Sequence, residues 1–188
     1  MKKTRIKIPT EANIRNSGYS WIIKITFYAF IISLAFTFVA SGVIPHIPIW
    51  LQVVILLLFI MINVIFDTIG TAVAAASQTP FHSMSTRQVS GAKRALYLIQ
   101  NGEKVSNFCN DVIGDICGIV SGTSGAFLVI SLIKNYPFHE LYTSLILTGI
   151  IASLTIAGKA AGKTFALKNS NQIVYQFALL LCIFKRES

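Results

Sequence analysis

Four blocks of apolar residues, each long enough to cross a lipid bilayer, constrain the fold of this chain more than any other feature. A transmembrane helix needs about 20 predominantly apolar residues to span the hydrocarbon. Charged residues make up only 12% of the chain, about half of their usual share in soluble domains. We therefore predict an all-α integral membrane protein. Its four transmembrane helices are expected at about residues 19–44, 51–76, 105–133 and 141–161.

Three further segments lie outside these blocks. Residues 1–18 form a basic polar tail that is too long and too polar for the start of a signal peptide. Residues 85–100 place apolar side chains on one helical face, which predicts an amphipathic helix on the cytosolic membrane surface. The last apolar run, residues 172–184, is too short for an upright span. We expect it to form a short interfacial helix.

The basic residues indicate the orientation of the chain. They gather in the N-terminal tail, between the second and third blocks, and near the C-terminal end. The connections on the other side contain Lys134 alone. Because cytosolic loops carry an excess of Lys and Arg, this pattern predicts a multi-pass protein of the cell (plasma) membrane with both termini in the cytosol. The net charge of +9 is thus a topology signal, and we expect no nucleic-acid partner.

Acidic residues inside the predicted spans are the main candidates for function, because each costs roughly 2.5–3.5 kcal/mol to insert. Asp111 and Asp115 are four residues apart and share one helix face, and Asp67 lies at a matching depth. Thr68 and Asn110 add neutral oxygen atoms. Oxygen-rich sites of this kind suit Mg²⁺ or another hard cation. The sequence therefore predicts a metal site formed by these five residues.

Two other interpretations of the same residues stay open. Lys159 is a basic residue in the fourth block and, by pairing with the Asp residues, would lock the helices together without an ion. Alternatively, the carboxylates would form a proton-coupled site. We expect no cofactor other than Mg²⁺ or a similar divalent cation as the bound or transported ion.

Small residues recur at the spacing of close helix contacts. Gly114, Gly118 and Gly122 repeat every four residues in the third block, and Gly158 and Gly162 do so in the fourth. Such stripes let two helix backbones approach closely. We expect these five glycines to serve helix packing, either within one subunit or between two.

Enzymatic chemistry finds no support in the sequence. The three histidines are scattered over both predicted sides of the membrane, and the three cysteines lie in apolar segments without a CxxC pair. The segment GKAAGKT lacks the glycine spacing of a phosphate-binding loop. We therefore predict a protein that is not an enzyme.

Three segments resemble the transmembrane domain of the CNNM/CorC family of magnesium and cobalt transporters. FDTIGTAVAAASQTP resembles its FSG-type start and the small-residue run behind it. KRALYLIQNGEKVSNFCNDVIGDI resembles its R-A-L-x-L-x-x-N-x-E-x-x-L segment followed by L-G-N-x-x-x-N. GKAAGKTFALKNSNQIVYQFALLL resembles its G-E-x-x-P-K-x-x-A-x-x-N stretch. The likeness spans about two-thirds of the chain.

The resemblance implies positions for the family's ion-site residues. The serine of FSG falls on Asp67, and the two asparagines of G-N-x-x-x-N fall on Asp111 and Asp115. The Glu of G-E falls on Lys159 and the Pro on Gly162. The negative charge is thus moved to the earlier spans, and Lys159 stands where the family has an acid.

The resemblance also implies a domain organisation and a function. Residues 45–188 correspond to a CorC-like transmembrane domain, and residues 19–44 form an additional helix ahead of it. The CBS domains that usually follow have no counterpart, which leaves room for a separate cytosolic partner. We expect a homodimer that binds or moves Mg²⁺, Co²⁺ or another divalent cation. The alternative is a non-transporting membrane scaffold or partner subunit in which Lys159 neutralises the Asp residues.

Overall fold

The computed structural model describes residues 17–135 and 139–184, and all regular structure within these ranges is helical. The η1 element is a 3₁₀ turn, and η2 is a π-helical turn. The elements in chain order are α1 (Ser17–Val43), η1 (Ile44–His46), α2 (Ile49–Ala75), α3 (Thr79–Thr86), α4 (Ala92–Gln100), α5 (Gly102–Asn107), η2 (Phe108–Ile113), α6 (Gly114–Asn135), α7 (Glu140–Lys168) and α8 (Ser170–Phe184).

Four helical segments of the described chain are long and apolar enough to cross a membrane, which confirms the predicted fold class. They are Ile23–His46, Ile49–Ala75, Gly102–Asn135 and Glu140–Lys168. The third joins α5, η2 and α6 into 34 residues, a length of about 51 Å at 1.5 Å per residue. Because the hydrocarbon is about 30 Å thick, one end of this helix extends beyond it.

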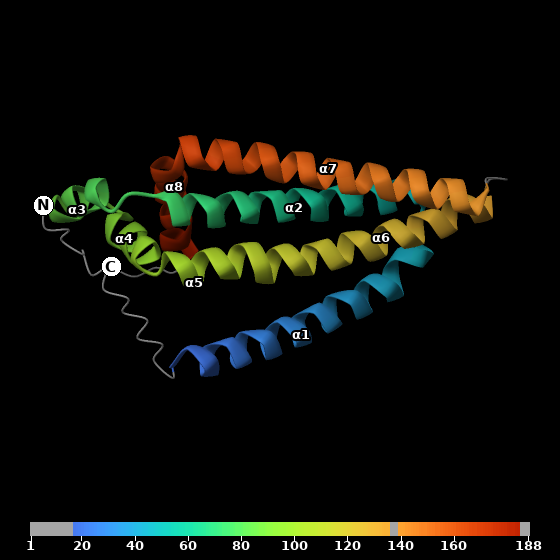
Figure 1. Cartoon of the computed structure of the whole chain (residues 1–188), viewed down its shortest axis with the longest axis horizontal. Helices are drawn as coiled ribbons and strands as arrows, with labels where there is room; N and C mark the ends of the chain where they lie inside the picture. The colour runs from blue at the N-terminus through green and yellow to red at the C-terminus, as the bar shows by residue number, and fades with distance from the viewer. Residues whose placement is uncertain (1–16, 136–138, 185–188) are drawn as a thin grey trace, which may run out of the picture.

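The long helices run side by side with alternating direction (Figure 1). We call the end with α3, α4 and α8 the platform end, and the end with η1 the hairpin end. Helix α2 is central, since it contacts both α6 and α7. Helix α1 approaches α6 at the hairpin end and diverges from it toward the platform end (Figure 1).

One buried glutamine fastens the hairpin end. The Gln52 side-chain nitrogen shares its two hydrogens among three acceptors, which are the carbonyl oxygens of Ile44 and Ile47 and the Ser131 hydroxyl, each at 3.0 Å. Gln52 is almost fully buried. The turn between α1 and α2 is thereby tied to α6.

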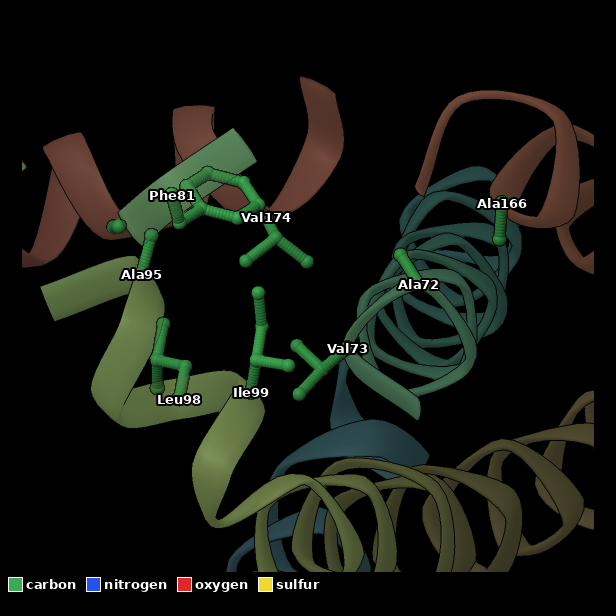
Figure 2. Close-up of a cluster of buried hydrophobic side chains, with 9 residues drawn as sticks. Ala72, Val73, Phe81, Ala95, Leu98, Ile99, Ala166 and Val174 are labelled. Carbon is green, nitrogen blue, oxygen red and sulfur yellow. The ribbon is translucent and has the colours of Figure 1, made fainter. Parts of the chain in front are cut away.

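The platform end has its own apolar core. Phe81 of α3, Leu98 of α4 and Val174 of α8 pack with Val73, near the end of α2 (Figure 2). Helix α8 lies across the end of the bundle (Figure 1), and Arg94 donates to the Leu181 carbonyl oxygen at 3.2 Å. The predicted short C-terminal helix is therefore present as a separate element.

The expected single helix over residues 85–100 is divided in two. Helix α3 continues to Thr86, and α4 begins only at Ala92. Gln88 and Gly91 between them have φ values of 55° and 81°. Because a right-handed helix needs negative φ, these residues end the first helix and redirect the chain. A side chain at position 91 would also collide with Leu179, so glycine permits the approach of α8.

Candidate functional site

Helix α2 presents a polar face to η2 and α6. Asn63, Asp67 and Gly70 are spaced by four and three residues, so they lie on one side of the helix. Asn63 is 2% exposed and Asp67 is 4% exposed. A β-carbon at Gly70 would overlap the Asn110 side-chain oxygen. Glycine at this position therefore lets Asn110 lie against the backbone of α2.

The π-helical turn η2 carries Asn110. Its side-chain nitrogen donates to the Ser106 hydroxyl at 3.3 Å, while its Oδ1 faces Gly70. One turn further on, Gly114 lies opposite the Oδ1 of Asn63. Single π-helical turns are common at functional sites. Here the turn is adjacent to the buried polar face of α2.

Three buried acceptor oxygens lie along this part of the bundle. Asn63 Oδ1, Asp67 Oδ2 and Asn110 Oδ1 accept no hydrogen bond from the residues that the structure describes. A buried polar atom without a partner costs about 1–3 kcal/mol. All three atoms are acceptors, and one belongs to a carboxyl group. This set suits a hard cation, which binds carboxylate and amide oxygens.

Lys163 of α7 lies closest to the buried carboxylate. Its Nζ is 3.7 Å from Asp67 Oδ2, and its side chain is 53% exposed. This distance exceeds a hydrogen bond, so the pair is a loose ion pair. The Lys163 side chain reaches from an exposed position at the edge of α7, as long basic side chains near helix ends commonly do.

Lys159, the lysine expected to neutralise the Asp residues, is half-buried on α7. Among the described residues, Lys163 makes the ion pair with Asp67. Sequence reasoning missed Lys163, although it lies four residues after Lys159 and on the same helix face. The role of Lys159 stays a prediction.

Asp111 and Asp115 share one face, as the spacing predicts, but that face is exposed. Within residues 17–135 and 139–184, no group of three acidic, His or Cys side chains is placed to hold a metal. The structure thus does not bring Asp67, Asp111 and Asp115 together. The side of this helix that contacts α2 carries Asn110 and Gly114 instead. The role of the two exposed carboxylates as ion ligands stays a prediction.

Four of the five predicted packing glycines lie at helix contacts. Gly114 and Gly118 face Asn63, and Gly158 and Gly162 approach Val64 and Thr68 of α2. Thr68 donates to the Val64 carbonyl oxygen at 2.7 Å, and its hydroxyl lies against Gly162. At the fifth glycine, Gly122, an added β-carbon would meet no atom within 4 Å among the described residues.

A polar pocket of about 550 Å³ leads from the platform end toward this site. Ser106, which accepts the hydrogen bond from Asn110, lines the pocket. Gln78, Glu103 and Asn107 also line it. Glu103 adds an acidic group near the opening that sequence reasoning did not single out. Asn110 is therefore one hydrogen bond away from this polar pocket, which we call the vestibule.

Comparison with known proteins assigns the chain to a family. No curated protein matches the sequence, and no solved structure matches the fold. The family model of the cyclin M (CNNM) transmembrane N-terminal domain matches residues 53–186. The match begins within α2 and includes the polar face, η2, α6, α7 and all of α8, while α1 lies outside it. The chain is therefore a membrane protein that belongs to the CNNM transmembrane domain family.

Proposed function

We propose that this protein binds and moves a divalent cation, Mg²⁺ or Co²⁺, at the junction of α2, η2 and α7. The observation that carries the proposal is the set of three buried acceptor oxygens on Asn63, Asp67 and Asn110. A cation bound at Asp67 would neutralise the carboxylate and give amide oxygens of this set a partner. Thr68 follows Asp67 on α2, beside Gly162, and supplies a further hydroxyl oxygen.

The vestibule provides the route for the ion in this proposal. It opens at the platform end, where the exposed basic residues Arg87, Lys93, Lys104 and Lys168 lie. The positive-inside rule assigns such an end to the cytosol. The ion would thus reach Asp67 from the cytosolic side of a plasma membrane, with Glu103 attracting it near the opening.

Lys163 has a defined part in this mechanism. Its ammonium group lies beside the same Asp67 oxygen that a metal ion would use. Ion and lysine would therefore compete for the carboxylate. Because the Lys163 side chain is half in solvent, it can move aside without leaving a buried charge unpaired.

The second candidate function is a non-transporting scaffold or partner subunit. The 3.7 Å contact between Lys163 and Asp67 favours it, since that pair neutralises the buried charge without an ion. In this case Lys163 fulfils the role that the sequence suggests for Lys159. The three unpaired oxygens favour the ion-binding function instead, because a loose contact with one lysine satisfies none of them by a hydrogen bond.

We also propose that two copies associate through the exposed face of α6. This face joins Asp111 and Asp115 to Ile119, Gly122 and Ala126, which are all exposed. Carboxylates facing lipid are costly, and the small residues permit close contact between helices. Disulfide trapping of Ile119→Cys in membranes would test the dimer. Ile130→Cys on the same face should also trap, whereas Ile156→Cys on α7 should not.

Ion flux into liposomes tests the main proposal. Purified protein should carry Mg²⁺ or Co²⁺, and Asp67→Asn should lower the affinity for the ion at least about ten-fold, equal to 1.4 kcal/mol. Asp115→Asn is the matched control, because its carboxyl group lies outside the site. Absence of flux in the wild-type protein, together with unchanged metal binding in Asp67→Asn, would reject the proposal in favour of the scaffold.

A further inference from the structure

A second pocket lies between α1, α2 and α6 and differs from the ion site in every chemical respect. Its volume is about 330 Å³, and it offers no polar surface. Ile32 and Phe36 of α1 form one wall, and Phe108, Val112 and Ile116 form the other. We call this space the wedge, because α1 diverges from α6 toward the platform end (Figure 1).

The wedge is closed toward the hairpin end. Phe36 and Phe59 meet edge to face with ring centroids 6.4 Å apart. Beyond them, Ala40, Ile44 and Val120 form a buried apolar cluster. A molecule in the wedge must therefore come from the platform side or from the surrounding bilayer.

The lining of the wedge selects the chemistry of its occupant. The wedge lies between helical segments that are long and apolar enough to cross the bilayer. Its wholly apolar lining excludes an ion or a head group. A hydrocarbon chain of the surrounding lipid fits this lining.

Two lysines lie where such a chain would carry its head group. Lys24 precedes Ile32 by two turns on α1, and Lys104 precedes Phe108 by one turn on α5. Both side chains are exposed. Lysines near the ends of membrane helices extend toward the interface, where they attract anionic lipids. The charge at the wide end of the wedge therefore suits a phosphate group.

We infer that the wedge binds one acyl chain of an anionic phospholipid from the platform-side leaflet, with Lys24 and Lys104 holding its phosphate. The site depends on α1, which lies outside the family match. It is also next to the ion site, because Phe108 and Val112 belong to the same π-helical turn as Asn110. An occupied wedge supports that turn from the side that faces α1.

Photo-crosslinking tests the acyl-chain site in the full-length protein. The probe is phosphatidylglycerol with a diazirine in its acyl chain, incorporated into nanodiscs, and labelled residues are identified by mass spectrometry. Val112→Trp fills the wedge and should lower labelling of Phe108 and Ile116 about five-fold. Ile156→Trp is the control, since it adds the same bulk to an exposed position on α7, away from the wedge, and should leave the labelling unchanged. Ile32→Trp and its neighbour Ile31→Trp repeat the comparison from the α1 wall.

Competition between lipids tests the head-group part. Unlabelled phosphatidylglycerol should displace the probe better than phosphatidylcholine, and Lys24→Gln with Lys104→Gln should reduce that preference by about five-fold per lysine. Equal competition by both lipids would overturn the assignment of the phosphate. Equal labelling of Val112→Trp and Ile156→Trp would overturn the wedge itself. Crosslinks between two protein copies at Ile32 or Val112 would assign the wedge to a second chain instead.

Discussion

Helix α1 and the span Gly102–Asn135 are both long apolar helices, yet they are built for different surroundings. In the apolar window of the α1 span only 11% of the residues are buried, against 44% in the span that contains α6. Helix α1 carries exposed bulky residues such as Phe27, Phe30 and Phe38. The other span carries Asn110, the glycines and buried serines.

The difference reflects what lipid and neighbouring helices each require of a membrane helix. Lipid accepts any apolar side chain, so a lipid-facing helix needs length and hydrophobicity alone. Contact between helices in a membrane depends on close packing and on polar groups that find partners. Small and polar residues in a span therefore indicate contact with protein. In this chain they coincide with the family match, and α1 lies outside it.

The largest expected effect separates two glycines. Gly70→Leu places a side chain where Asn110 and Cys109 lie, so we expect a loss of about 3 kcal/mol of stability from overpacking. Gly42→Leu on α1 meets nothing within 4 Å among the described residues and should be neutral. Thermal unfolding in a single detergent measures both. Equal tolerance of the two variants would break the distinction between the helices.

The next effect concerns the attachment of α1. Gln52→Leu removes three hydrogen bonds that tie the α1–α2 turn to α6, and it should cost about 2 kcal/mol because carbonyl groups lose their donor. Ser131→Ala removes only one of these bonds and should cost about half as much. The same unfolding assay applies. An equal loss of unfolding free energy in Ser131→Ala and Gln52→Leu would show that Gln52 does not stabilise the α1–α2 turn.

A third comparison lies within α7. Lys163→Met removes the cation beside Asp67 and should raise Mg²⁺ affinity about ten-fold, or 1.4 kcal/mol, because no lysine then competes for the carboxylate. Lys159→Met should change the affinity less. Isothermal titration of both variants with Mg²⁺ checks this. Loss of folding in Lys163→Met, with no gain in binding, would instead support the scaffold function.

The smallest effect is expected on α1 itself. Phe36→Ala removes the edge-to-face contact with Phe59 and should cost about 1 kcal/mol. Phe38→Ala, at a residue that is 78% exposed, should have no measurable effect on unfolding. A loss for Phe38→Ala comparable with that of Phe36→Ala would show that α1 has a protein partner on its outer face.

The sequence identifies several residues of the site, but it does not show how these residues come together. Asp67 was identified because a carboxyl group in a span needs a reason, and Asn110 and Thr68 followed as nearby oxygens. Spacing pairs Asp111 with Asp115, and a matching depth and the family resemblance add Asp67, yet the face of Asp111 and Asp115 is exposed. Spacing fixes which residues share a face but not which neighbour that face meets. Lys163 is placed at the site only by the packing of α7 beside α2.

The sequence by itself determined the number of spans, their approximate limits and the family, because these depend on local hydrophobicity and on short motifs. The tertiary structure alone decided which polar atoms meet. The rotation of α6 about its axis, the π-helical turn at Phe108–Ile113 and the glycine contacts of α2 set that outcome. One additional residue in a helical turn changes the face that every later side chain presents. Consecutive residues also point about 100° apart around a helix, so Asn110 lies in the buried site while Asp111, its neighbour in sequence, is exposed.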